Sequence, residues 1–231
     1  SRGLGDVYKR QSHFAFKKSP VDNFAAAFSN CGFMGIPLVR AGFGDEAVFL
    51  LVGFVVLLNL LQWTYGAALL KGDKGAVSLK GVLLNPITVG TAAGVVLFVT
   101  GLGSRLPGVL GGAIGGLAAL NSPIAMLVLG IYMAQTSLKE TVMSPRLYVL
   151  SAVRLLLIPA VTLALLTPLP VDLTMKYVIL LGASAPVGAN VAVYAQLYGK
   201  DYSYACRTVV LSTVLSILTL PVLVAAAGIL W

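Results

Sequence analysis

The chain has 231 residues, of which 58% are hydrophobic and only 10% are charged, and its mean hydropathy is +0.93. A soluble domain of this size would carry about a quarter charged residues, so the composition excludes an ordinary soluble domain and is typical of a polytopic membrane protein. The formal net charge of +8 does not indicate a nucleic-acid partner, because basic residues in a membrane protein mainly set its orientation in the bilayer.

The first 22 residues form a polar and basic lead-in. Within it, Ser1 to Gln11 resembles translated adapter read-through rather than a signal peptide, since no apolar core follows the basic start. We therefore exclude Ser1–Gln11 from the fold, and we predict that residues 1–22 as a whole are a non-native or disordered lead-in.

Seven apolar segments follow, each close to the roughly 20 residues that a helix needs to cross a bilayer. They are predicted as helices at residues 23–42, 47–70, 81–101, 120–138, 147–167, 174–198 and 202–231. The glycine-rich stretch Gly108–Gly116 could be a loop, a short interfacial piece or the start of the fourth helix, and its glycines would allow close packing or flexing. Cys31 and Cys206 lie in or beside apolar segments, so we expect free thiols.

The basic residues are distributed unequally between the two ends of these helices. One end receives Lys17, Lys18, Lys71, Lys74, Lys80, Lys139, Arg146 and Lys200, and the other receives Arg40, Arg105 and Lys176. The positive-inside rule predicts that the richer end is cytoplasmic. The chain is then a multi-pass protein of the cell membrane (the inner or plasma membrane), and its C-terminus lies outside.

Two of the predicted helices contain residues that interrupt a helix at membrane depth. Pro186 removes a backbone N–H and frees a carbonyl one turn back, and such a break survives only inside protein or along a watery cavity. A similar order of residues surrounds Asn30 in the first helix, with Gly35 and Pro37 close behind it. The broken helices are the first and the sixth, an odd number apart, so they run in opposite directions, as in an inverted repeat.

An inverted repeat with these broken helices needs five helices in each half. We assign residues 23–70 to the last two helices of the first repeat, residues 71–80 to a cytoplasmic connector, and residues 81–231 to the second five-helix repeat. The predicted fold class is therefore an all-α polytopic membrane protein with crossed broken helices, of which about seven helices are present. About three N-terminal helices are expected to be missing, which would make the chain N-terminally truncated.

Two motifs carry a resemblance to a known family. They are Ser-Asn-Cys-Gly-Phe-Met-Gly-Ile-Pro-Leu at residues 29–38 and Ala-Pro-Val-Gly-Ala-Asn at residues 185–190, supported by Asn85-Pro86, Pro123, the Arg154 to Pro159 segment and Leu220-Pro221. Over about residues 22–231 the chain resembles the auxin efflux carrier family, which includes bacterial organic-acid permeases. The resemblance implies ten helices in two inverted halves, with a substrate anion bound where the broken fourth and ninth helices cross. Plant members carry a proline where this chain has Ser29.

The candidate substrate site comprises residues at or near the two breaks. An amide beside a break can donate to a carboxylate, and the N-terminus of the half-helix adds partial positive charge. The candidates are Ser29, Asn30, Gly35, Pro37, Ser184, Pro186, Asn190 and Tyr194. The alternative for Asn30 and Asn190 is hydrogen bonding between helices without a ligand, and the alternative for Tyr194 is ordinary packing.

Three further polar residues lie inside predicted helices. Arg154 is the one charge well inside such a helix, and an arginine at this depth is a candidate charge partner for the substrate. The alternative is that its side chain snorkels toward the lipid headgroups. Asn59 and Gln62 share one helix face and are predicted to join helices.

These features predict a secondary transporter, a permease or efflux carrier, that moves small organic anions such as dicarboxylates or auxin-like weak acids by alternating access. A cation or proton antiporter is the alternative, but no predicted helix has an Asp or Glu in its interior. An intramembrane enzyme is less favoured, because the predicted helices also lack histidine and Ser184 lacks a base. We expect no enzymatic activity, cofactor or metal. The expected partners are the anion, the lipid bilayer and, in a homodimer, a second copy of the chain.

The predicted orientation can be tested by labelling single cysteines in intact cells. We expect a reagent outside the cell to react at residue 231 and not at residue 200, because the basic loops hold Arg146 and Lys200 in the cytoplasm. Reaction at residue 200 but not at residue 231 would show that the orientation is reversed.

Overall fold

The protein is described by a computed structural model over residues 19–71, 84 and 86–231, and within these residues every regular element is a helix. The predicted all-α membrane fold class is therefore confirmed. In the described part of the chain, three helices are long and apolar enough to cross a membrane, namely Cys31–Lys71, Pro145–Leu166 and Tyr202–Leu230. Residues 1–18 and 72–83 lie outside the described part, so the expectations for the lead-in and for the connector at 71–80 stay predictions there.

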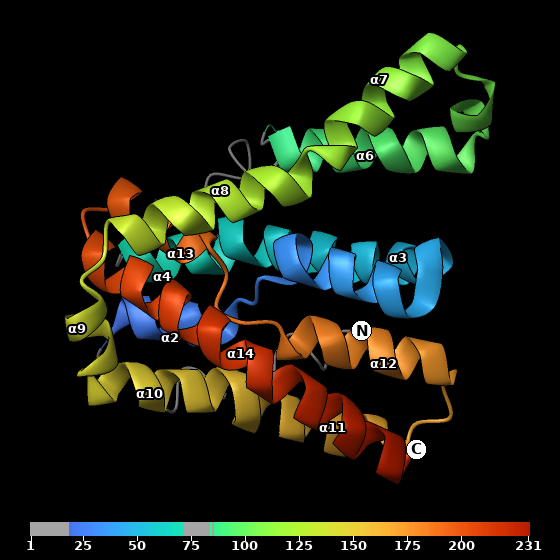
Figure 1. Ribbon diagram of the computed structural model, residues 1–231. Coiled ribbons are helices and arrows are strands. Elements are labelled where there is room, and N and C mark those ends of the chain that lie inside the picture. Colours follow the sequence, from blue (N-terminus) through green and yellow to red (C-terminus); the bar gives the residue numbers. More distant parts are fainter. Residues whose placement is uncertain (1–18, 72–83, 85) are drawn as a thin grey trace.

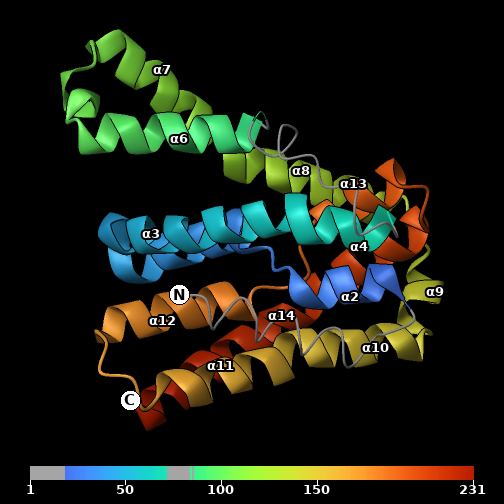
Figure 2. The ribbon, with the colours of Figure 1, turned by 180° about the vertical axis from the view of Figure 1, so that it is seen from behind.

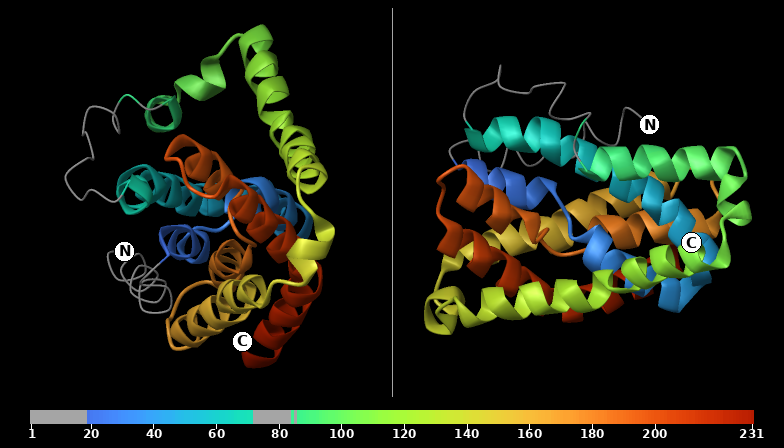
Figure 3. Two further views of the ribbon diagram at one scale, coloured as in Figure 1. Left: turned by 90° about the vertical axis from the view of Figure 1, so that its left-hand side faces the viewer. Right: turned by 90° about the horizontal axis from the view of Figure 1, so that it is seen from above.

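The helices form a layered bundle from which one arm stands out (Figure 1). In chain order they are α2 (Pro20–Ala27), η1 (Cys31–Gly35), α3 (Ile36–Leu61), η2 (Gln62–Gly66), α4 (Ala67–Lys71), α6 (Pro86–Val99), η3 (Leu102–Arg105), α7 (Gly108–Ala119), α8 (Asn121–Ala134), α9 (Leu138–Val142), α10 (Pro145–Ala152), η4 (Val153–Leu157), α11 (Ile158–Leu166), α12 (Leu173–Ser184), α13 (Asn190–Leu197) and α14 (Tyr202–Leu230). Figure 2 shows from behind that α3, α12 and the joined α10 and α11 run side by side, that α6 runs along α3 on the side away from α12, and that α7 slants away from them. Seen from the end, the arm of α6 to α8 curves around one side of the bundle (Figure 3).

The first two predicted spans are joined at a single residue. Gly44 has φ 80 and ψ −178, a conformation that only glycine adopts readily, and it bends α3 into two arms. The arms pack against each other, because a Cβ added at Gly35 would lie 3.4 Å from Leu51 and one added at Gly32 would lie 3.7 Å from Val55. Asp45, which lies between the predicted helices at 23–42 and 47–70, therefore begins the second arm of a helix.

The glycine-rich stretch at residues 108–116 is helical. It forms most of α7, which continues into α8 with Leu120 between them, so it is the start of the fourth span rather than a loop. A Cβ added at Gly111, Gly112, Gly115 or Gly116 would meet nothing within 4 Å. Within the described part of the chain these glycines do not serve close packing.

The first helix begins earlier than predicted. α2 starts at Pro20, three residues before the expected start at Asn23, and the Ser19 side chain caps it by accepting from the backbone N–H of Asp22 at 3.4 Å. A serine N-cap followed by proline at the first helical position and an acid in the first turn is a favourable helix start. Residues 19–22 therefore belong to the fold rather than to a disordered lead-in, and Asp22 is a helix residue.

The two ends of the bundle are tied by different polar contacts. At one end Tyr202 donates to the Gln135 side chain (2.8 Å), and at the other Trp231 Nε1 donates to Thr167 Oγ1 (3.0 Å). Among the described residues, Lys71 ends α4, Lys139 lies in α9, Arg146 lies in the first turn of α10 and Lys200 lies between α13 and α14, whereas Arg40 lies in α3 before its bend, Arg105 ends η3 and Lys176 lies in the first turn of α12. Figure 1 shows the first group of these helix ends on one side of the bundle and the second group on the other. The basic residues thus divide between the ends as the sequence predicted, whereas which end faces the cytoplasm stays a prediction.

Part of the core lies where α2 packs against η2. Phe24 and Phe28 are buried, with their ring centroids 4.6 Å apart. A Cβ added at Gly66 would lie 2.5 Å from Cε2 of Phe24 and 3.0 Å from Cε2 of Phe28. Since interiors are close-packed, the two rings leave room only for glycine at this position.

We predict that Gly66→Ala lowers the free energy of unfolding by about 1–3 kcal/mol, because the added methyl overpacks the two phenylalanine rings. The measurement is the thermal melting of purified protein in detergent. Gly53→Ala is the matched control, since a Cβ there meets nothing within 4 Å and alanine favours a helix by about 1 kcal/mol over glycine. Equal melting temperatures for the two variants would contradict this packing.

Candidate functional site

The two helix breaks lie against each other in the middle of the bundle. Ser29 and Val187 form an isolated antiparallel bridge, in which the Asn30 N–H donates to the Pro186 carbonyl (2.8 Å) and the Gly188 N–H donates to the Phe28 carbonyl (3.0 Å). The predicted contact between the first and sixth spans is therefore confirmed. On the first span it involves residues 28–30.

The two breaks have different local causes. Around Pro186, α12 ends at Ser184 and α13 begins at Asn190, since a proline cannot continue the ladder of helical hydrogen bonds. The first break has no proline. Pro37 lies farther along, two residues after the π-helix η1, where a wider turn accommodates its missing N–H. Gly35 and Pro37 thus shape the helix after the break and do not open the break itself.

Gly188 allows the two backbones to approach. A Cβ added there would lie 3.2 Å from the carbonyl oxygen of Ser29 and 3.3 Å from that of Phe28. Backbone oxygens cannot give way as a flexible side chain can, so a larger residue would push the two breaks apart. The hydrogen bonds across the crossing therefore depend on a glycine at this position.

Four helix ends meet at the crossing. α2 and α12 end there, while the continuous helix of η1 and α3 and the helix α13 begin there. Each C-terminal end presents carbonyl groups without a partner in its own helix, and each N-terminal end presents N–H groups. The crossing therefore gathers partial negative charge from two helices and partial positive charge from two others.

Arg154 reaches the carbonyls at both C-terminal ends. Its side chain is only 1% exposed. It donates from Nη1 to the Ala26 carbonyl at 3.1 Å, from Nη2 to that of Ala183 at 2.6 Å and from Nε to that of Ala185 at 3.1 Å. The snorkelling alternative is therefore wrong, because the guanidinium lies between the two breaks.

The side chains predicted at the breaks are mostly buried. Ser29, Asn30 and Ser184 are buried, and Ser184 Oγ has no hydrogen-bond partner among the described residues. Asn190 donates from Nδ2 to Oε1 of Gln62 at 2.7 Å. Gln62 thus joins helices as predicted, and in this conformation Asn190 makes the interhelical bond that the sequence left open as its alternative role.

Tyr194 lies apart from the crossing, in an aromatic cluster. Its ring centroid is 5.1 Å from that of Phe24, 5.3 Å from that of Trp63 and 6.1 Å from that of Tyr198. Its hydroxyl is buried with no hydrogen-bond partner among the described residues.

Of the predicted site residues, the structure brings Ser29, Asn30 and Pro186 into the crossing and places Ser184 and Asn190 at its edges. Tyr194, Gly35 and Pro37 lie farther along their helices.

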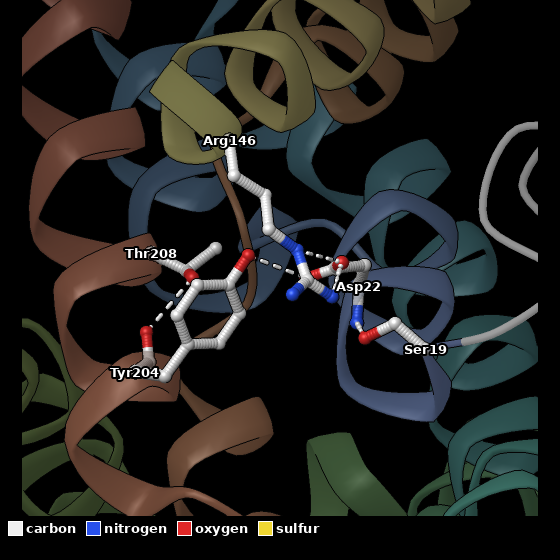
Figure 4. Close-up of polar contacts among 5 residues, drawn as sticks. All are labelled: Ser19, Asp22, Arg146, Tyr204 and Thr208. Atoms are coloured by element: carbon white, nitrogen blue, oxygen red, sulfur yellow. Dashed lines mark hydrogen bonds and ion pairs between the residues drawn. The ribbon is translucent and has the colours of Figure 1, made fainter. Parts of the chain in front are cut away.

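A buried acid that the sequence analysis missed lies on the first broken span. Asp22 is 1% exposed and accepts from Arg146 Nε at 2.8 Å and from the Tyr204 hydroxyl at 2.6 Å (Figure 4). The Arg146 guanidinium also lies over the Tyr204 ring, 5.1 Å from its centroid. These contacts tie α2 to α10 and α14. The sequence analysis had assigned Asp22 to the lead-in, whereas it lies in the first turn of α2.

The Ser19-Pro20 helix start was the one local signal that could have placed Asp22 inside a helix. Its two partners are 124 and 182 residues away in the sequence, so no local pattern predicts the cluster.

We predict that Asp22→Asn lowers the free energy of unfolding by about 1–3 kcal/mol, because a buried network loses its charged acceptor. The Arg146 side chain is 56% exposed, so water can solvate its guanidinium in the variant and limits the loss of stability. Asp45→Asn is the control. It removes the acid of the Arg40–Asp45 pair, whose side chains are 61% and 84% exposed, and should change stability by less than about 1 kcal/mol. Thermal melting that shifts equally in both variants would mean that the Asp22 cluster contributes no more than a surface ion pair.

Comparison with known proteins identifies relatives along nearly the whole chain. The sequence model of a family described as "Membrane transport protein" matches residues 16–81 and 73–224. A "Putative malonate transporter" of Rhizobium meliloti (strain 1021) is 28% identical over 212 residues, which cover 87% of this chain and 65% of that protein. An "Uncharacterized transporter" of Methanothermobacter thermautotrophicus is 27% identical over 199 residues, which cover 85% of this chain and 64% of that protein. The chain thus spans slightly less than two thirds of the length of these relatives.

Proposed function

The chain belongs to the auxin efflux carrier family of membrane transport proteins, and on this premise we propose that it serves the secondary transport of small organic anions by alternating access. The observation that carries the proposal is the crossing of the two breaks, where the helices that start at Cys31 and Asn190 both begin. Helix N-termini at a break inside a membrane bundle suit an anionic group.

The chemistry of the crossing favours a carboxylate. Each helix N-terminus carries about half a positive charge and can present backbone N–H groups to an anion. The amides of Asn30 and Asn190 add donors at the edges of the same crossing. A relative named for malonate transport supports small dicarboxylates as the first substrates to test, with auxin-like weak acids as the second class.

A cation or proton antiporter remains the competing proposal, and Asp22 bears directly on it. Such a mechanism needs an acid that can exchange its counter-ion. Asp22 Oδ2 accepts from Arg146 and Oδ1 accepts from Tyr204, so a transported cation would have to displace a guanidinium. This pairing supports the anion proposal over the antiporter.

Residence in the cell membrane with the C-terminus outside, a homodimer and the absence of enzymatic activity also stay predictions.

Asn190→Leu and Asn30→Leu should each weaken malonate binding about tenfold or more, because a hydrogen bond to a charged group contributes about 1.5–3 kcal/mol. Binding is measured as the malonate-dependent rise in melting temperature of the purified protein, and transport as uptake of labelled malonate into proteoliposomes, with labelled rubidium as the cation comparison. Both variants are expected to insert into the membrane but to lose malonate uptake.

Gln62→Leu is the control for the interhelical role of Asn190, since it removes the Asn190 partner. It should lower the melting temperature but change malonate affinity less than about threefold. Unchanged binding in Asn30→Leu and Asn190→Leu, together with full activity of Pro186→Ala, would place the site elsewhere. Uptake of rubidium but not of malonate would support the antiporter.

A further inference from the structure

The feature that goes beyond this proposed function is the contact of one buried cation with two helix ends. We propose that Arg154 is a positioning residue that makes the crossing selective for anions. It does so by neutralising the C-terminal ends of both broken helices, and not by touching the substrate. The inference rests on the proposed function, because it explains why the crossing accepts an anion and not a cation.

The hydrogen bonds of Arg154 reach both broken helices from one guanidinium. Ala26 is the next-to-last residue of α2, Ala183 is the next-to-last residue of α12, and Ala185 is the C-cap of α12. Nη1 donates to the first helix, while Nη2 and Nε donate to the second. The planar fork of arginine holds several donors in fixed directions, so it suits carbonyls that converge from two chains.

A charge balance gives the consequence of these contacts. Each C-terminal end carries about half a negative charge, so the two ends together carry about one, which the single charge of Arg154 offsets. The two N-terminal ends at the same crossing then leave about one positive charge, which matches one carboxylate. Without the guanidinium, the partial charges of the four helix ends would nearly cancel, and the crossing would not prefer an anion over a cation.

The donors of Arg154 argue against direct contact with the substrate. Nε, Nη1 and Nη2 each donate to a carbonyl. A bidentate bond to a carboxylate uses two of these nitrogens, so forming one would remove hydrogen bonds from the breaks. The candidate role as a charge partner of the substrate is thus less favourable than a role through the helix ends.

The local structure around Arg154 is suited to this position. Arg154 lies in the π-helix η4, which lies against α2, α12 and α14. Pro159 follows two residues after η4, and a wider turn before a proline accommodates the missing N–H. Residues in η4 therefore have a direction that a regular α-helix would not give them, and Arg154 is directed between the two breaks.

The test compares the malonate affinity of wild type, Arg154→Gln and Arg154→Lys in purified protein, with folding checked by thermal melting. We expect Arg154→Gln to weaken malonate binding at least about tenfold, since the neutral side chain leaves the C-terminal ends uncompensated. Arg40→Gln is the matched control, because it removes the guanidinium of a side chain that is 61% exposed, and it should leave the affinity within about threefold of wild type.

Arg154→Lys separates charge from mere packing. A lysine is charged below its pKa and neutral above it, whereas arginine stays charged throughout this range. Malonate affinity of Arg154→Lys at pH 6.5 should therefore exceed that of Arg154→Gln at least about threefold, and it should fall about tenfold as the pH rises to 10.5. Wild type and Arg40→Gln should show no such fall, and a structural role of the side chain alone would not produce it.

Three outcomes overturn the inference. The first is wild-type affinity in Arg154→Gln, and the second is an Arg154→Lys affinity as weak as that of Arg154→Gln at pH 6.5. The third is a malonate affinity of Arg154→Lys that does not change between pH 6.5 and 10.5, and this measurement decides alone if Arg154→Gln does not fold. A wild-type protein that binds neither malonate nor another carboxylate would instead defeat the proposed function, and the inference with it.

Discussion

The need of backbone groups for partners at membrane depth governs the architecture of this protein. A helix that stops inside the bilayer leaves N–H and carbonyl groups that lipid cannot satisfy. Here each break supplies part of what the other lacks, through the Asn30 and Gly188 N–H groups and the Pro186 and Phe28 carbonyls. Ser212 Oγ accepts from the Val187 N–H as well, so α14 completes the same network. Because the partners come from spans far apart in sequence, neither break can persist without the rest of the bundle.

Two arginines on the continuous helix of α10, η4 and α11 bind α2 at two different points along its length. Arg146, at the start of α10, pairs with Asp22 near the end of the bundle and is half-exposed. Arg154, two turns later, is buried and binds carbonyls of both breaks. The first contact fixes where α2 begins, and the second fixes where it ends. α2 is only eight residues long, so with both ends held it has little freedom to tilt.

The sequence contained the signals for breaks but not for their partners. Pro186 marks one break through its missing N–H, and Gly32, Gly35 and Pro37 after Asn30 mark the other only within a few residues. The inward direction of Arg154 could not be predicted, because a buried and a snorkelling arginine have the same sequence pattern. The Asp22 cluster required contacts across 124 and 182 residues. The single-residue turn at Gly44 was not predicted, because the predicted helices stop at residue 42 and resume at residue 47, on either side of the polar residues Asp45 and Glu46.

That turn has a mechanical consequence. The helix that leaves the first break continues through Gly44 directly into a second, longer arm, and the arms pack together at Gly32 with Val55 and at Gly35 with Leu51. A connection of one residue with a fixed positive φ has no slack. The half-helix beyond the break is therefore joined to a neighbouring span without an intervening loop, and it packs against that span.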